Sequence, residues 1–224
     1  MMNLALFDLD HTLLPLDSDH EWGEFLCRTG AVDATEFGRR NDAFYADYQA
    51  GTLDPAAYLE FALGTLASFA PARLAALHAQ FMADVILPAI QPQALALLQQ
   101  HHDAGDLVAI VTATNQFVTA PIAAALGVEH LIAAVPARDA AGNITGKLHG
   151  TPTYGPGKVL HTQAWLAGLG KTLDSFDSSH FYSDSHNDIP LMSLVTHPVA
   201  TNPNAALRAH ATSLGWPSLH LFND

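Results

Sequence analysis

Residues 4–14 read LALFDLDHTLL, an apolar run that is followed at once by Asp8 and Asp10. A short apolar run that ends in polar residues is typical of a buried strand. Side chains alternate between the faces of a strand, so both carboxylates point the same way if the strand extends this far. Two like charges side by side are unfavourable unless a cation or a shared proton lies between them. The stretch therefore predicts a strand that ends in a charged site.

The composition excludes several classes of partner. The 224 residues include 9 Lys and Arg against 22 Asp and Glu, which gives a net charge of −13. This charge disfavours nucleic acid or an anionic membrane and favours a small ligand. The single cysteine excludes an internal disulfide and a multi-cysteine zinc site. We find no signal peptide or membrane-spanning run, so we expect a cytoplasmic protein, either monomer or homodimer.

Beyond residue 90 the sequence alternates between strand-like and helical patterns. Strands are expected at 4–10, 106–114, 130–137, 180–185, 197–201 and 218–222. Helices are expected at 93–102, 117–127 and 157–170. Such alternation predicts an α/β fold with a parallel sheet covered on both faces. The segment 140–150 resembles a turn or small hairpin attached to that sheet.

The first 90 residues break this alternation. From about residue 17 to about residue 86 the recognisable patterns are all helical. We infer a helical insert placed directly after the first strand, where it can act as a lid. The expected division is a core of residues 1–14 and 87–224 and a cap of residues 15–86.

Polar residues gather where the predicted strands end, which is where open α/β sheets bind ligands. In chain order these residues are Asp8, Asp10, Thr112, Thr114, Asn115, Asp184, Ser185, Asn187 and Asp188, and Lys158 opens a helix in TYGPGKV. Acids clustered with a lysine favour a divalent cation and an anionic substrate, because Mg²⁺ takes hard oxygen ligands and phosphate oxygens. A carboxylate in this setting can attack phosphorus, and a second one can transfer a proton.

Four short motifs resemble those of the haloacid dehalogenase superfamily and follow its order. FDLDHTLL resembles the DxDx[TV] motif, IVTAT the hydroxyl motif, GPGK the lysine motif and YSDSHNDIPLM the acidic motif. The insert stands where members with a type-one (C1) cap carry theirs, and the chain resembles the subgroup that contains phosphoserine phosphatase. The resemblance implies a Rossmann-like, doubly wound sheet and a Mg²⁺-dependent phosphomonoesterase that forms an aspartyl-phosphate.

The resemblance also implies the roles of the motif residues. Asp8 matches the nucleophile and a metal ligand. Asp10 matches the general acid/base, and its backbone carbonyl also faces the metal. Thr112, beside the N–H of Ala113, matches the hydroxyl that binds the phosphoryl group, and Lys158 matches the lysine that stabilises it. Aspartate at position 10 is shared with phosphatases and phosphomutases, so the motif favours these reactions.

The acidic motif supplies the remaining metal ligands. Asp184 matches a direct Mg²⁺ ligand, and Asp188 matches an acid that holds the water shell of the metal. The expected substrate-binding residues of the core are Ala113, Thr114, Asn115 and Asn187.

The cap gives fewer signs of the substrate. Asp17 stands where phosphoserine phosphatases resemble one another in carrying a glutamate for the substrate's ammonium group. We therefore expect Asp17 to recognise an amine, helped by Asp19 or Glu21, with helix capping as the alternative. No arginine lies between Arg40 and Arg73 to bind a carboxylate. Histidinol phosphate, an amine without a carboxylate, then fits better than phosphoserine.

Other interpretations stay open. The aromatic residues Trp22, Phe44, Tyr45 and Tyr48 either line a pocket for a ring or form the core of the cap. A phosphotransferase or phosphomutase would use the same scaffold, and a non-catalytic metal-dependent binding module is the remaining alternative.

Overall fold

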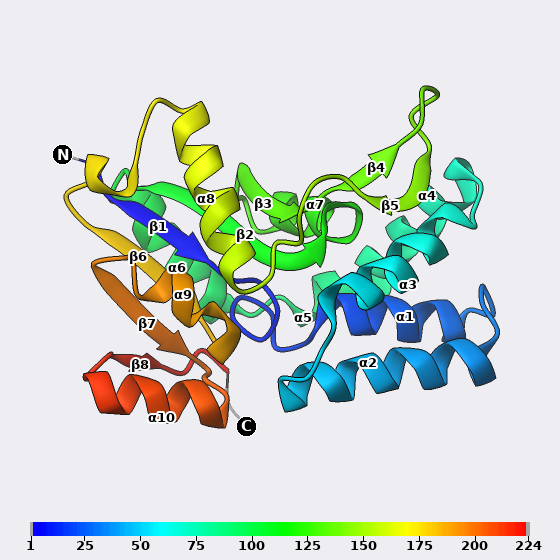
Figure 1. The fold of residues 1–224 in the computed structure, drawn as a ribbon, viewed down its shortest axis with the longest axis horizontal. Helices are drawn as coiled ribbons and strands as arrows, with labels where there is room; N and C mark the ends of the chain where they lie inside the picture. The colour runs from blue at the N-terminus through cyan, green and yellow to red at the C-terminus, as the bar shows by residue number, and fades with distance from the viewer. Residues whose placement is uncertain (1, 223–224) are drawn as a thin grey trace.

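The structure is a computed structural model, and it describes residues 2–222. Six strands form one parallel sheet in the order β3-β2-β1-β6-β7-β8 (Figure 1). Their bounds are β1 Leu4–Phe7, β2 Leu107–Asn115, β3 His130–Ala134, β6 Ser179–Ser183, β7 His197–Thr201 and β8 Ser218–Leu219. The first strand lies centrally, between β2 and β6, and the strand order reverses there. The parallel sheet confirms the predicted α/β fold.

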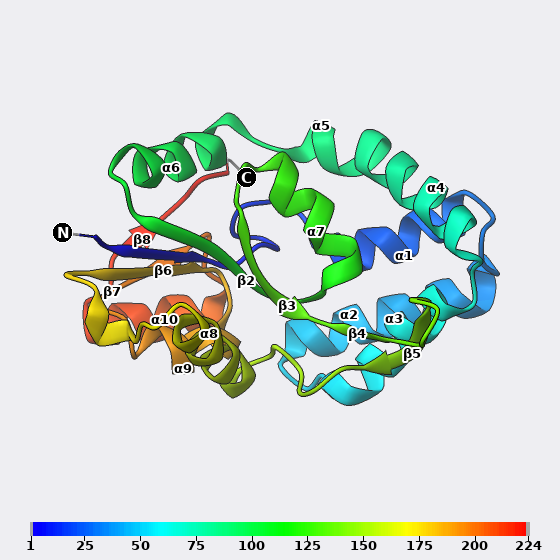
Figure 2. The same ribbon diagram turned by 90° about the horizontal axis from the view of Figure 1, so that it is seen from above.

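Helices cover both faces of this sheet (Figure 2). Those on one face are α6 (Pro92–Asp103) and α7 (Gln116–Ala125), and those on the other are α8 (Pro156–Gly168), α9 (Ile189–Met192) and α10 (Ala205–Leu214). Short 3₁₀ turns occupy Leu173–Ser175 and His186–Asp188. In β1, Ala5 and Phe7 pack in the apolar cluster of α6 and α7, and Leu4 and Leu6 pack in that of α8–α10. Burial on both sides explains why this strand is apolar at every position.

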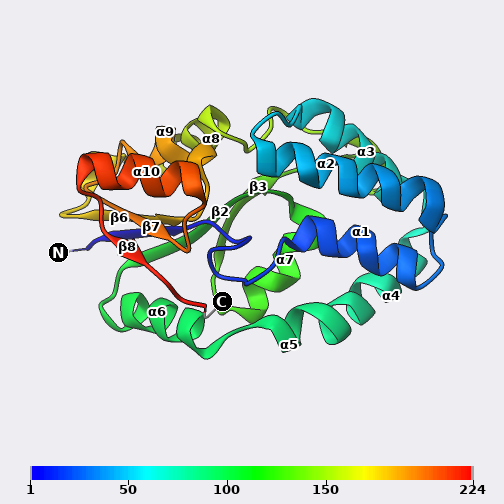
Figure 3. The same ribbon diagram turned by 90° about the horizontal axis from the view of Figure 1, so that it is seen from below.

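A helical cap lies between β1 and α6, beside the carboxyl ends of β1 and β2 (Figure 3). Its elements are α1 Ser18–Arg28, a π-helical turn Ala34–Gly38, α2 Arg39–Ala50, α3 Pro55–Ala67, α4 Pro71–Phe81 and a π-helical turn Met82–Ile86, after which α5 Leu87–Ala89 leads back to the core. Asp54 caps α3 by accepting hydrogen bonds from two backbone N–H groups of its first turn, and Pro55 occupies the first helical position. The predicted helical insert is confirmed.

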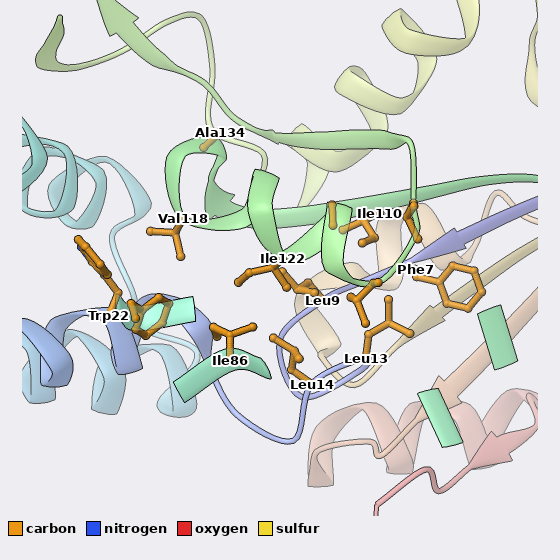
Figure 4. Close-up of a cluster of buried hydrophobic side chains, with 14 of the residues drawn as sticks. Phe7, Leu9, Leu13, Leu14, Trp22, Ile86, Ile110, Val118, Ile122 and Ala134 are labelled. Atoms are coloured by element: carbon orange, nitrogen blue, oxygen red, sulfur yellow. The ribbon is translucent and has the colours of Figure 1, made fainter. Parts of the chain in front are cut away.

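One apolar cluster joins the cap to the core (Figure 4). It runs from Phe7 and Ile110 in the sheet, through Leu13, to Trp22 and Ile86 in the cap. All five side chains are buried. The cap therefore shares its packing with the core and does not enclose a separate one.

The first strand is shorter than predicted. It ends at Phe7 rather than at residue 10, although the Asp8 N–H still bonds to β6. Beyond it the backbone turns, because the N–H groups of residues 12–14 donate to the carbonyl of Leu9. The prediction that the strand extends to residue 10 was therefore wrong, although Asp8 and Asp10 line the same pocket. These residues lie on the turn that follows it.

The hairpin was also placed wrongly. Its strands β4 (Pro136–Arg138) and β5 (Ile144–Leu148) form a separate antiparallel sheet that packs on α3 of the cap instead of joining the main sheet. Gly146 eases this contact, because a Cβ atom at this position would lie 3.3 Å from the Cα of Gly64. The hairpin therefore links the core to the cap a second time.

Two further points concern the range of residues that the structure describes. Residues 1, 223 and 224, which the predicted core includes, lie outside them. Within residues 2–222, no single helix has the length and apolarity to cross a membrane, although one pair of helices bent by 88°, Pro71–Ala89 with Pro92–Asp103, meets both criteria jointly.

Candidate active site

The motif residues meet where β1, β2 and β6 end. Asp8 follows β1, Thr112 lies near the end of β2, and Asp184 follows β6. Because these strands are neighbours, their carboxyl ends place the side chains at one edge of the sheet. A pocket between this edge and the cap is lined by the predicted residues Asp8, Asp10, Asp17, Thr112, Ala113, Thr114, Lys158, Asn187 and Asp188.

Two predicted residues, Asp184 and Asn115, do not line this pocket. Asp184 lines an adjoining pocket, and Ser185 lines both pockets. Asn115 is at neither surface. Its Oδ1 accepts a hydrogen bond from the Val118 N–H at 3.2 Å and caps α7, and its Nδ2 donates to Asp19 Oδ1 at 3.3 Å. Asn115 thus supports the wall of the pocket from behind.

Lys158 joins the acids of two motifs. Its Nζ donates to Asp8 Oδ1 at 2.9 Å and to Asp188 Oδ2 at 2.7 Å. All three residues are at most 5% exposed. Burial alone would lower the pKa of Lys158, but the charges of Asp188 and Asp8 outweigh it and raise this pKa. The contacts keep a positive charge beside Asp8, where a phosphoryl group would bring negative charge.

Asp10 is held by two donors. The Ser18 N–H donates to its Oδ1 at 2.7 Å, and the Thr114 hydroxyl donates to its Oδ2 at 2.8 Å. Burial raises the pKa of Asp10 to about 6, the charge of Asp17 adds to this, and the two hydrogen bonds oppose it. A carboxyl group with a pKa near neutrality suits general acid/base catalysis.

Asp184 is tied to the first motif. Its N–H donates to the Thr12 hydroxyl oxygen at 3.0 Å, and that hydroxyl lies 3.3 Å from its Oδ1. Burial, followed by the charges of Asp8 and Asp188, raises the pKa of Asp184 well above its usual range. One lysine does not neutralise this group of acids.

The oxygen atoms at this edge fit a magnesium ion. Mg²⁺ takes hard oxygen ligands and keeps several waters beside one or two carboxylates. Asp8 and Asp184 each use one carboxylate oxygen in a side-chain hydrogen bond within the described chain, so the other oxygen is available. In Asp188 a single oxygen, Oδ2, takes the donors of both Lys158 and Ser183. The excess negative charge and the donor set both suit a divalent cation.

Neutral donors complete the core side of the pocket. The Thr112 hydroxyl oxygen accepts the Thr114 N–H at 3.2 Å, which leaves its own proton for a ligand. Asn187 lines the pocket, and its buried Nδ2 has no hydrogen-bond partner in the part of the chain that is described. Such donors suit the oxygens of a phosphoryl group.

Asp17 caps α1. Its Oδ1 accepts hydrogen bonds from the N–H groups of Asp19 at 3.0 Å and His20 at 2.9 Å. The capping alternative is therefore confirmed. Asp17 also lines the pocket, so its recognition of an amine stays a prediction.

None of the arginines in residues 2–222 lines the pocket. Arg39, Arg40 and Arg73 are exposed. The guanidinium of Arg40 lies 4.6 Å from the centroid of the Phe61 ring, on a separate surface groove. A substrate carboxylate would therefore meet acids in the cap and no guanidinium group.

The aromatic residues divide between pocket and core. Phe44, Tyr45 and Tyr48 line the pocket, together with Tyr58, which the sequence analysis did not single out. Trp22 lies in the shared apolar cluster instead, with 4% exposure. The cap side of the pocket therefore combines aromatic rings with the acids Asp17 and Asp19.

Sequence reasoning missed the residues that hold the acids in place. Thr12 positions Asp184, and Ser183 positions Asp188. Both stand inside the quoted motifs, so their position was a usable signal. Tyr58 had no such signal, because only the packing of α3 turns it toward the pocket.

The chain is similar in sequence to several known proteins. A model of the haloacid dehalogenase-like hydrolase family matches residues 5–193. Histidinol-phosphatase of Neisseria meningitidis is 44% identical over 220 residues, which cover 98% of this chain and 99% of that protein.

Two solved structures share the fold. A Bordetella pertussis protein of unknown function has 52% identity and a TM-score of 0.94, with 99% of this chain and 100% of that chain covered. A substrate-bound phosphoserine phosphatase has 17% identity and a TM-score of 0.68, with 98% and 93% covered, and this likeness concerns the fold alone. The chain belongs to the haloacid dehalogenase-like hydrolase family and is a phosphatase with the fold of phosphoserine phosphatase.

Proposed function

We propose that this phosphatase hydrolyses a small amine-bearing phosphomonoester, with histidinol phosphate as the first candidate. The observation that carries the proposal is the make-up of the pocket, in which Lys158 lies between Asp8 and Asp188 while the cap wall offers acids and no arginine. The name of the Neisseria relative supports the same substrate. Phosphoserine fits less well, because its carboxylate would face acids.

Asp8 is the nucleophile in this proposal. Its carboxylate oxygen attacks phosphorus in line with the ester bond, and an aspartyl-phosphate forms as that bond breaks. Lys158, Thr112 with the neighbouring Ala113 N–H, and Asn187 surround the phosphoryl oxygens and stabilise their charge.

Asp10 transfers the protons. Its protonated carboxyl group gives a proton to the leaving alcohol oxygen, and the resulting carboxylate then takes one from the water that hydrolyses the aspartyl-phosphate. Thr114 and the Ser18 N–H keep this carboxyl group in place through both steps.

The proposed cofactor is Mg²⁺. Asp8, Asp184 and the backbone carbonyl of Asp10 would hold it, and Asp188 would hold its water shell. When bound, the ion neutralises the charge shared by the acids and the phosphate. We assign residues 1–14 and 87–224 to the catalytic core and residues 15–86 to the cap. Monomer or homodimer stays a prediction.

The test is phosphate release from a panel of esters with Mg²⁺, comparing wild type with Asp8→Asn. The panel contains p-nitrophenyl phosphate, phosphoserine, histidinol phosphate and sugar phosphates. We expect release by wild type alone, with histidinol phosphate ranking first. If Asp8→Asn were as active as wild type, Asp8 would not be the nucleophile. If phosphoserine ranked first, the substrate assignment would be overturned. Transfer of phosphate to added alcohols in place of water would favour a phosphotransferase.

A further inference from the structure

Asp19 carries a buried carboxyl group in the cap wall of the pocket. The residue is 6% exposed and lines the pocket. Its Oδ1 accepts the hydrogen bond from Asn115, whereas its Oδ2 has no hydrogen-bond partner among residues 2–222. A buried carboxylate oxygen without a partner is unfavourable, so the site is suited to a ligand that brings a donor.

The surroundings of Asp19 are aromatic. The Tyr58 phenol lies beside the Asp19 carboxyl group and lowers its pKa, and Phe44, Tyr45 and Tyr48 line the same pocket. Flat aromatic walls favour a planar ring that stacks or packs edge to face against them. The donor that reaches Oδ2 is therefore best carried by a ring.

The two cap acids have different neighbours. Asp17 immediately precedes Ser18, whose N–H donates to Asp10 at 2.7 Å, so it adjoins the catalytic end of the pocket. Asp19 lies further along α1. Its pKa is raised to about 8 by burial first and then by the charge of Asp17, with a smaller effect of Asp10.

We propose that Asp19 binds a ring nitrogen of the substrate, while Asp17 faces its amine. The substrate class is then a phosphate ester of an amino alcohol that carries a nitrogen heterocycle such as imidazole. This inference rests on the proposed function and adds a second recognition site to it.

The test separates the two nitrogen groups by using four esters. Histidinol phosphate carries both groups, 2-(imidazol-4-yl)ethyl phosphate the ring, 2-aminoethyl phosphate the amine and p-nitrophenyl phosphate neither. Each kcat/KM is divided by that for p-nitrophenyl phosphate in the same variant. The variants are Asp19→Asn, which keeps the oxygen that Asn115 contacts, and Asp17→Asn, which keeps a good helix cap. Glu21→Gln, on the same helix but away from the pocket lining, is the matched control.

Asp19→Asn should lower the ratio for both imidazole esters by roughly ten- to hundredfold, since a hydrogen bond to a charged group is lost. Asp17→Asn should lower the ratio for both amines. If Asp19→Asn left the imidazole ratios unchanged, or lowered the 2-aminoethyl ratio equally, the proposal would be overturned. Wild type that hydrolyses p-nitrophenyl phosphate but neither imidazole ester would also overturn it, while leaving the phosphatase assignment intact.

A second measurement needs only wild type, in case the Asp19 variant does not fold. Histidinol and phenylalaninol share an amino alcohol but differ in their rings, and only the imidazole carries a nitrogen. We expect histidinol to inhibit p-nitrophenyl phosphate hydrolysis at a lower concentration than phenylalaninol. Equal inhibition, or stronger inhibition by phenylalaninol, would overturn the role of Asp19.

Discussion

The core side and the cap side of the pocket differ in how completely their carboxyl groups are hydrogen-bonded. On the core wall the Asp8 and Asp188 side chains each meet Lys158, and both oxygens of Asp10 accept hydrogen bonds. On the cap wall Asp19 has an oxygen without a partner in the described chain. The core wall is organised before a substrate arrives, as chemistry on a phosphoryl group requires. On the cap side, the free oxygen of Asp19 gains a hydrogen-bond partner only when a substrate with a suitable donor binds.

The largest expected effect comes from breaking the core wall. Lys158→Met leaves Asp8 and Asp188 buried and close together without their counter-charge. We expect kcat to fall by about 10²- to 10³-fold. The free energy of unfolding should fall by about 3–5 kcal/mol. Phosphate release and urea denaturation measure the two effects. Lys147→Met, at an exposed lysine, is the control. A kcat within threefold of wild type would contradict the arrangement.

The support behind Asp184 should show a smaller effect. Thr12→Val removes the hydroxyl that Asp184 contacts through its N–H and its carboxylate. Since residues behind a ligand tune metal binding, we expect the Mg²⁺ concentration for half-maximal activity to rise by about 10- to 100-fold. A Mg²⁺ titration of phosphate release measures this. Thr12→Ser keeps the hydroxyl and should behave like wild type, and equal effects of both substitutions would exclude the hydroxyl as the cause.

On the cap wall the same logic predicts a gain in stability. The folded-state pKa of Asp19 is about 8 because of burial and the charge of Asp17, so this acid stabilises the fold fully only at low pH. Its contribution is lost as pH rises from the unfolded value near 4 through 8.

Asp19→Asn does not titrate, so the metal-free variant should be more stable than wild type at pH 8, by about 1–3 kcal/mol. The difference should shrink toward pH 5. Thermal unfolding at a series of pH values measures it, with Glu21→Gln as the control. A gain that is the same at pH 5 and pH 8 would show that ionisation of Asp19 is not its cause.

The smallest effect concerns the hairpin that reaches the cap. Gly146→Ala places a Cβ atom 3.3 Å from Gly64 and also strains a residue with φ of +79°. Gly142→Ala, at φ of +87°, has the strain without a neighbour within 4 Å. We expect both variants to lose about 1–2 kcal/mol of stability from the strain. Gly146→Ala should lose more, by an amount that thermal unfolding of the two variants gives directly. Equal losses would mean that the contact with α3 contributes nothing.

The core wall was largely predictable from the sequence, and the cap wall only in part. Asp8, Lys158 and Asp188 stand in short motifs at the ends of strands, and the topology of a parallel sheet brings such ends together whatever lies between them. On α1, Asp19 and Glu21 looked equivalent in the sequence. Only the packing of the helix decides that Asp19 faces the pocket, because neighbouring positions on a helix point in different directions.

Two errors have different origins, one in a local turn and one in a tertiary contact. The first strand was extended to residue 10 because the apolar pattern continues through Leu9, but the carbonyl of Leu9 accepts the hydrogen bonds of a turn instead. The hairpin at 140–150 was attached to the main sheet because its sequence shows only that it turns. Its docking on α3 depends on Gly146 and Gly64, which are 82 positions apart in the chain, so no local pattern reports it.

The shared apolar cluster has a consequence for the modularity of this enzyme. Leu63 and Phe81 in the cap pack in the same cluster as Leu13, Val118 and the sheet. A cap taken from a relative would therefore meet a foreign apolar surface, and the exchange would expose or overfill it. New specificity is more readily obtained by substituting single side chains on the pocket wall than by transplanting the whole cap. The cap and the catalytic core of this protein therefore behave as one packing unit and are not interchangeable modules.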